Sequence, residues 1–236
     1  MATTSEDNYW IASTEYPMKP TLIISFSFVL SLIASFDQTK ITIDHNANDA
    51  ASRDFKFKNV PSPVKDDAAA KAKLVLIDGE IDGNGADLAA VTDGLLPTDS
   101  DEPGANFFFN AGSSGGRFRL DFGHAIDVAQ VNTYSWHPNT RGPQVYKLYG
   151  SMGDDPKFNA DPNRRMDPTS VGWVMIASVN TAATQGGDGG QYAVGISSPS
   201  GTLGKYRHLM FDCFVTEASD DWGNTFYSEI DVIEKK

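Results

Sequence analysis

The chain has 236 residues, of which 40% are hydrophobic and 21% are charged, so it can bury a full core as an ordinary globular protein. Its net charge is −12. A surface of this sign repels phosphate backbones and anionic lipid, which disfavours binding to nucleic acid or to a membrane surface. Cys213 is the only cysteine in the sequence, which excludes a disulfide within the chain.

Residues 1–35 are interpreted as an N-terminal extension that contains a secretory signal peptide. Lys19 precedes an uncharged stretch, residues 22–36, in which Ile, Leu, Phe and Val predominate and small residues lie near the end. This order is typical of a cleaved signal, and the run is shorter than the ~20 residues of a membrane span. Translation then starts at Met18, or the segment before the apolar run is unusually long. The alternatives are a buried element and an uncleaved anchor.

Residues 36–236 are expected to form one domain, because no linker-like tract divides them. Residues 66–72 (DDAAAKA) suit one or two helical turns, and Gly123 is expected to break the chain between two strands. Runs that alternate apolar and polar residues predict strands throughout this part of the chain, at residues 40–44, 55–58, 73–77, 118–122, 126–136, 145–149, 173–179, 192–196, 206–215 and 225–233.

Residues 112–116 (GSSGG) match the nucleophile pattern G-x-S-x-G. That chemistry requires a turn from a strand into a helix. Here residues 107–109 and 118–122 are both predicted to be strands, and two strands joined by Gly and Ser form a hairpin. The sequence also contains no P-loop, dinucleotide fingerprint or zinc spacing. We therefore predict no catalytic residue.

The order of elements from residue 115 to residue 151 resembles the discoidin family. In that family, which comprises the coagulation factor five/eight type C domains and related galactose-binding-like carbohydrate modules, a strand ends in Asp-Leu-Gly. This chain has Asp121-Phe122-Gly123, then a strand, a polar loop (HPNTRGP) and a strand ending in Tyr-Gly-Ser. The resemblance implies an all-β jelly-roll sandwich of two antiparallel sheets over residues 36–236. The paired cysteines of many animal members are absent.

The resemblance also implies a carbohydrate site on the polar loop. Modules of this family often place an Arg, with His or Asn, on this loop, where the chain has His137, Asn139 and Arg141. Guanidinium, imidazole and amide groups offer directed hydrogen bonds to sugar hydroxyls, and Trp136 or Trp222 could cover the apolar face of a pyranose. The alternative is structural: the prolines shape a turn, Arg141 pairs with an acid, and Trp136 belongs to the core.

A structural calcium ion is the cofactor that the resemblance implies. Many members use an early Asp-Gly pair beside the last strand, and Asp93-Gly94 and Glu229 occupy those places here. A hard cation bound by carboxylates and carbonyls would tie the two ends of the domain together. The alternative is that Asp93 and Glu229 are ordinary surface acids.

These features predict a secreted, non-catalytic module that binds a carbohydrate. Nucleic acid is not an expected partner, and no stable membrane span is expected after cleavage of the signal. A second hypothesis is a structural or adhesive extracellular subunit that binds other protein chains or itself. A third is a hydrolase or lyase that acts on polysaccharide, and turnover lost on substitution of one acid would establish it.

The first testable prediction concerns export. Expressed with its own leader in a bacterium, the protein should be found outside the cytoplasm with a new N-terminus near residue 36, because the apolar run is the part that signal peptidases remove. N-terminal sequencing of the exported protein measures this. An intact N-terminus on cytoplasmic protein would contradict it.

Overall fold

One long strand, β3 (Gly115–His137), organises the computed structural model, which describes residues 39–182, 189–216 and 223–236. β3 runs for 23 residues, so the predicted break at Gly123 is wrong. Gly123 has a φ of 75° and lies within a shift of pairing register between Asp121 and Ile126. A glycine tolerates this left-handed conformation, and the strand bends at this place instead of ending.

The remaining elements are seven strands and five short 3-10 helices in the described residues. The strands are β1 (Lys40–Ala47), β2 (Lys73–Asp78), β4 (Val145–Ser151), β5 (Val174–Asn180), β6 (Gly190–Ser197), β7 (Gly204–Phe214) and β8 (Tyr227–Glu234). The 3-10 helices are η1 (Asn48–Ala50), η2 (Ala69–Lys71), η3 (Leu88–Thr92), η4 (Pro103–Ala105) and η5 (Pro168–Val171).

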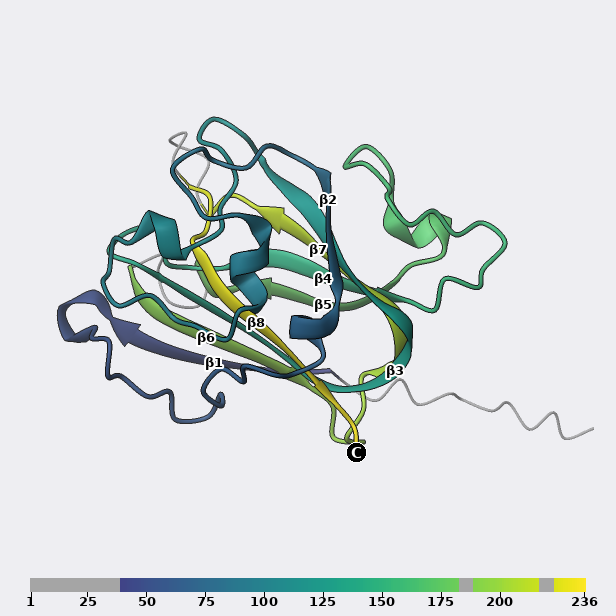
Figure 1. Cartoon of the computed structure of the whole chain (residues 1–236), viewed down its shortest axis with the longest axis horizontal. Helices are drawn as coiled ribbons and strands as arrows, with labels where there is room; N and C mark the ends of the chain where they lie inside the picture. Colours follow the sequence, from purple (N-terminus) through teal and green to yellow (C-terminus); the bar gives the residue numbers. More distant parts are fainter. Residues whose placement is uncertain (1–38, 183–188, 217–222) are drawn as a thin grey trace, which may run out of the picture. The chain divides into compact units, whose positions relative to one another are not determined.

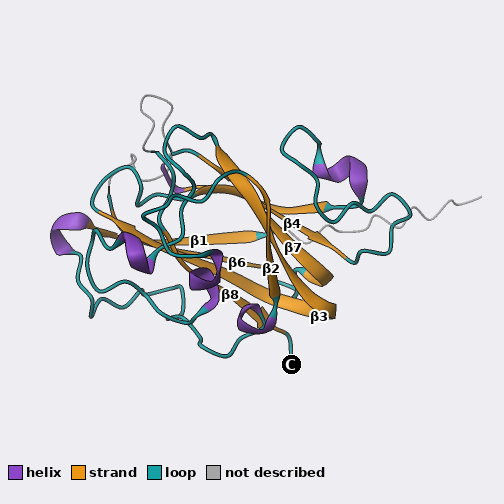
Figure 2. Ribbon diagram, turned by 45° about the horizontal axis from the view of Figure 1, so that its top comes forward, coloured by secondary structure: helices purple, strands orange, loops and turns teal. Residues whose placement is uncertain are grey.

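The strands form a β-sandwich whose two layers share β3 (Figures 1 and 2). The first half of β3 pairs with β2 on one side and β7 on the other, and β4 and β5 continue that layer. The second half pairs with β6 and β8, and β1 lies beyond β6. Every pairing is antiparallel. The all-β antiparallel sandwich predicted from the sequence is therefore confirmed, with its two layers joined through one continuous strand.

The core lies between the two layers and draws on both halves of β3. Phe118 and Leu120 from the first half and Val131 from the second half are each 0% exposed. They belong to one cluster with Phe211 of β7 and Ile230 of β8. Because side chains alternate across a strand, the same run of β3 sends its polar residues to the outer faces. Cys213 is also buried in this core, as the alternation around it predicts.

Two predicted strands are wrong. Residues 55–58 form no strand. The backbone N–H groups of the next two residues, Asn59 and Val60, donate hydrogen bonds to the carboxylate of Asp44, at 2.6 and 2.8 Å, and not to a neighbouring strand. Residues 107–109 make no hairpin with β3. Phe107 instead exchanges two backbone hydrogen bonds with Tyr227 at the start of β8, each 2.9 Å long.

A buried arginine fastens the long connection of residues 152–173 to the outer face of the β3–β7 pair. Arg117 is 4% exposed, and its Nη1 donates to the carbonyl oxygens of Pro162, Asn163 and Met166 at 2.8–3.2 Å. Its Nη2 donates to Asp212 at 2.9 Å. Apart from the short helix η5, the connection has no regular secondary structure within the described residues, and the guanidinium holds its backbone through these carbonyl groups.

Among the described residues, no helix is long and apolar enough to cross a lipid bilayer. The described residues all belong to one compact unit. The predicted signal peptide lies outside the described residues.

The second testable prediction follows from Arg117. Arg117→Met should lower the free energy of unfolding by about 3 kcal/mol or more, because it removes the donor of three carbonyl groups and leaves the buried carboxylate of Asp212 with Arg164 as its remaining cation. Arg53→Met is the matched control, since the Arg53 side chain is 71% exposed and should change stability by less than about 0.5 kcal/mol. Urea unfolding measures both. Equal stabilities for the two variants would show that residues 152–173 are held by other contacts.

Candidate functional site

Arg141, the central residue of the predicted loop, is packed against two aromatic rings. Its guanidinium carbon lies 4.6 Å from the ring centroid of Phe108 and 4.1 Å from that of Phe226. These two rings stack on each other at 4.0 Å. The Nε of Arg141 donates to the carbonyl of Asn224 at 3.3 Å, and the residue is 9% exposed. Such a desolvated cation–π arrangement stabilises the fold by up to about 2 kcal/mol.

The side chain of His137 is also buried in the protein interior. It is 5% exposed, and its ring contacts the edge of Phe226 at 4.5 Å between centroids. Its Nδ1 accepts a hydrogen bond from the backbone of Asn139 at 3.2 Å. Burial first, and then the charge of Arg141, lower the pKa of His137 to about 4, so the ring is neutral at physiological pH. Asn139 is the exposed residue of the three.

Trp136 lies on the outer face of β3 and is 5% exposed. Leu96 and Pro97 line a very small void beside it. In the described part of the chain, its indole N–H has no hydrogen-bond partner. Trp222, the other predicted aromatic platform, lies outside the described residues. The structure therefore brings His137 and Arg141 together beneath the loop surface, and a ligand role for these residues stays a prediction.

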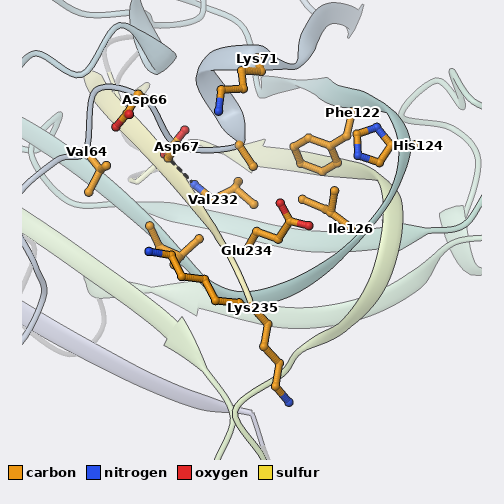
Figure 3. Close-up of a pocket in the computed structure, with 13 residues that line it drawn as sticks. Val64, Asp66, Asp67, Lys71, Phe122, His124, Ile126, Val232, Glu234 and Lys235 are labelled. Carbon is orange, nitrogen blue, oxygen red and sulfur yellow. Dashed lines mark hydrogen bonds between the residues drawn. The ribbon is translucent and has the colours of Figure 1, made fainter.

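A groove of about 730 Å³ lies where the bend of β3 meets η2 and the end of β8 (Figure 3). Phe122 and Ile126 come from the bend, and Val232 comes from β8. The half-buried Phe122 ring lies beside His124. The carboxylate of Glu234 points toward Phe122 and Ile126, and the side chain of Lys71 reaches toward the groove from η2. An apolar floor is thus surrounded by polar groups that project into the groove.

The wall of the groove is held in place by Asp67. Its Oδ1 accepts from the backbone N–H of Ala70 at 3.0 Å, which closes the turn at η2. Its Oδ2 accepts from the N–H of Val232 on the edge of β8 at 2.9 Å. Ala68 donates in turn to the carbonyl of Val232 at 3.1 Å. The segment predicted as helical turns is therefore a short 3-10 turn fixed to the last strand.

Besides Asp67, two buried carboxyl groups, those of Asp231 and Glu229, lie on β8 next to this wall. Asp231 is 0% exposed and accepts from the N–H of Val64 and from the hydroxyl of Tyr134, each at 3.0 Å. Burial raises the pKa of Asp231. Burial, together with the negative charge of Asp231, raises the pKa of Asp67 to about 6.

Glu229 is the third of these acids. It is 1% exposed, and its Oε2 accepts from the N–H of Gly94 at 2.9 Å. Burial, and then the charges of Asp231 and Asp93, raise its pKa to about 9. The structure thus places Asp93-Gly94 beside Glu229, as the family resemblance implies. The Oδ1 of Asp93 accepts from the N–H of Leu95 at 2.8 Å.

The oxygen donors at Asp93 and Glu229 are of the type that calcium prefers. Within the described residues, no three His, Cys, Asp or Glu side chains are grouped closely enough to hold a metal ion. Backbone carbonyls and water would therefore have to complete the six to eight oxygens that calcium takes. We propose that calcium binds here, supported by the accumulation of negative charge around a buried carboxyl that otherwise retains a proton.

Sequence reasoning missed the groove and its polar residues. The sequence predicts Phe122 only as the end of a strand, and no motif marks Lys71 or Glu234. The one local signal was Gly123, which marks a change of backbone direction directly after an aromatic residue. No sequence pattern shows that η2 and β8 would meet at this bend.

No protein-family model matches the chain, and no curated protein matches it. Among solved structures, a mutant of the lectin binding domain of lectinolysin complexed with Lewis b is similar at a TM-score of 0.46 and 12% identity, over 74% of this chain and 99% of that chain. The chitosan-binding module 2 of a Paenibacillus chitosanase/glucanase, in complex with chitotriose, is similar at a TM-score of 0.43 and 14% identity, over 70% of this chain and 98% of that chain.

The family 32 carbohydrate-binding module of C. perfringens NanJ, in complex with galactose, gives a TM-score of 0.42 and 9% identity, over 70% of this chain and 95% of that chain. These matches are all at low sequence identity and at TM-scores below 0.5, and they assign no family to this chain. They concern the course of the backbone and assign no ligand to this chain.

The third testable prediction concerns Glu229. A group whose pKa is raised on folding stabilises the protein below its ordinary pKa, and this contribution is lost as pH rises through the folded value. With chelator present, the free energy of unfolding should therefore fall between about pH 5 and pH 9, by up to ~1.4 kcal/mol per pH unit from this one residue. Glu229→Gln should flatten the curve. Parallel curves for the two proteins would contradict the buried, protonated state.

The same stability measurement can be repeated with calcium in place of chelator. At pH 8, calcium at ~100 times its dissociation constant would add about 2.7 kcal/mol, which corresponds to a rise in melting temperature of roughly 5–10 °C. Asp93→Ala should remove this rise. Equal melting temperatures with calcium and with chelator would leave Asp93 and Glu229 with a structural role alone.

Proposed function

We propose that this protein is a secreted, non-catalytic module that binds a carbohydrate in the groove at the bend of β3. The observation that carries the proposal is the position of the Phe122 ring in the apolar floor of the groove, which Glu234, Lys71 and His124 also line. The sequence run before residue 36 supports secretion, and its test is the export experiment above.

The chemistry of the groove suits a sugar ring. A pyranose has an apolar C–H face and a rim of hydroxyl groups, each of which donates and accepts hydrogen bonds. Phe122 offers an aromatic face, Glu234 accepts hydrogen bonds, and Lys71 donates them. Both polar residues are exposed and therefore accessible to a ligand. A volume of about 730 Å³ lies within the range of ~300–1,000 Å³ that is usual for ligand pockets.

The geometry favours the groove over the loop that carries Arg141. The guanidinium of Arg141 and the imidazole of His137 are both buried, and both already contact the ring of Phe226. If either group moved outward to bind a ligand, its contact with the ring of Phe226 would be lost. In the groove, by contrast, the side chains of Glu234 and Lys71 are exposed, and neither makes a salt bridge with another described residue.

The fourth testable prediction follows from the stacking role of Phe122. We expect the exported protein to bind at least one glycan on an array, and Phe122→Ala to weaken that binding tenfold or more, which is about 1.4 kcal/mol. Phe122→Tyr should bind nearly as well as the wild type, because it retains the aromatic face. Titration calorimetry with the best glycan measures the three affinities.

Arg141→Met is the matched control at the other end of the sandwich. It retains a long side chain against Phe108 and Phe226, and it should leave glycan binding unchanged if the groove is the site. A glycan that is lost in Arg141→Met but retained in Phe122→Ala would place the site on the predicted loop. Turnover of the glycan during the titration would contradict a non-catalytic role.

A further inference from the structure

The bend that carries Phe122 into the groove is held by the residue before it. β2 pairs with β3 only as far as Asp121, and pairing with β7 resumes at Ile126. Between these points, the Oδ1 of Asp121 accepts a hydrogen bond from the backbone N–H of Gly123 at 2.9 Å. This bond spans Phe122 and fixes the turn of the backbone on both sides of it. A group that competes for the same oxygen would therefore act on the groove.

The carboxylate of Asp121 is already surrounded by donors. The Nε of Arg207 donates to Oδ1 at 3.1 Å, and its Nη2 donates to Oδ2 at 3.4 Å. The Nη1 of Arg119 lies 3.6 Å from Oδ2. Burial acts to raise the pKa of Asp121, but the hydrogen bonds from Arg207 and Gly123 bring it below the ordinary value. A carboxylate oxygen accepts about two hydrogen bonds, so Oδ1 has no place for a third donor.

His208 is poised to become that third donor. It is the direct partner of Asp121 in the pairing of β3 with β7, and it is 4% exposed. Its Nδ1 lies 3.6 Å from the Oδ1 of Asp121 and, among the described residues, has no hydrogen-bond partner. The ring of Phe158, from the connection of residues 152–173, stacks on the imidazole at 5.1 Å between centroids. The imidazole is thus confined beside the oxygen that holds the bend.

Resting on the proposed function, we infer that acid weakens ligand binding in the groove, because a proton on His208 draws the Oδ1 of Asp121 away from the N–H of Gly123. Hydrogen bonds between charged groups are roughly twice as strong as those that involve a neutral partner. An imidazolium and the guanidinium of Arg207 therefore both outcompete the neutral backbone N–H. Once Gly123 is released, the backbone on either side of Phe122 loses its fixed turn.

The charges around His208 set the direction of this response. They are Asp121 and Arg119 on β3, Arg207 on β7 and Asp161 on the connection. Burial, the largest influence, lowers the pKa of His208; the two carboxylates act to raise it and the two guanidinium groups to lower it, and the pKa stays below the ordinary value. A histidine of this kind stabilises the closed structure above its ordinary pKa of ~6.5, and the contribution is lost as pH falls.

Asp67 in the groove wall gives the opposite sign. Its pKa is raised to about 6, first by burial. Its contribution to stability is therefore present in acid and is lost as pH rises through that value. A loss of binding on acidification thus has the sign of His208 and not that of Asp67.

The fifth testable prediction is a pH titration of the ligand-free protein by NMR. The amide resonance of Gly123 and the ring resonances of His208 should shift with one common midpoint, below about pH 6.5. His208→Phe retains a ring against Phe158, and His208→Gln is a smaller neutral replacement. In whichever of these variants is folded, the Gly123 resonance should stay constant over the same range. His45→Gln is the matched control, because His45 stacks on Tyr192 of β6, and it should leave the Gly123 titration unchanged.

Calorimetry with the best array glycan then tests the link to binding. From about pH 7.5 to about pH 5, wild-type affinity should fall about tenfold, the loss expected when Phe122 no longer contributes. The folded His208 variants should show the same affinity at both pH values.

Three results would overturn the inference. A Gly123 resonance that does not follow His208, or that still titrates in the His208 variants, would do so and leave the glycan site standing. So would a pH dependence of binding that persists in the His208 variants but disappears in His124→Gln, since His124 lines the groove itself. If no array glycan binds in a Phe122-dependent way, the proposed function fails, and the inference about binding fails with it whatever Gly123 shows.

Discussion

The fold depends on one constraint: β3 must pair with four other strands although a strand has only two edges. It meets this constraint by changing layers, so that β2 and β7 flank its first half and β6 and β8 flank its second half. The change requires the bend around Gly123. Both layers then share one covalent element, and their relative position is fixed by the backbone itself as well as by the core between them.

The groove and the carboxyl cluster both arise from this change of layer. Where β3 leaves the first layer, the edge of β8 is not covered by β2, and the segment around η2 takes that place through Asp67. Asp231 and Glu229 also lie on β8, and their carboxyl groups accept hydrogen bonds from the backbone N–H groups of Val64 and Gly94. Acidic side chains thus perform the task that a neighbouring strand performs elsewhere in the sheet.

Local pattern predicted most strands, because alternation of apolar and polar residues is a property of each segment alone. It failed at residues 55–58, where the carboxylate of Asp44 binds the neighbouring backbone, and at Gly123, where a glycine bends a strand without ending it. The predicted loop contains polar residues of the types that bind sugars, yet the burial of Arg141 depends on two phenylalanines from distant segments. The groove could not be predicted, since Phe122 and Glu234 meet only in the folded chain.

The length of β3 also has a consequence for the order of folding. Its second half lies early in the chain relative to both of its partners, β6 and β8, and β8 is the last described element. During synthesis that half remains a strand with two open edges, the kind of surface that recruits other chains into aggregates. Non-local pairing of this kind also makes folding slow. The sheet can therefore close only after β8 has been made.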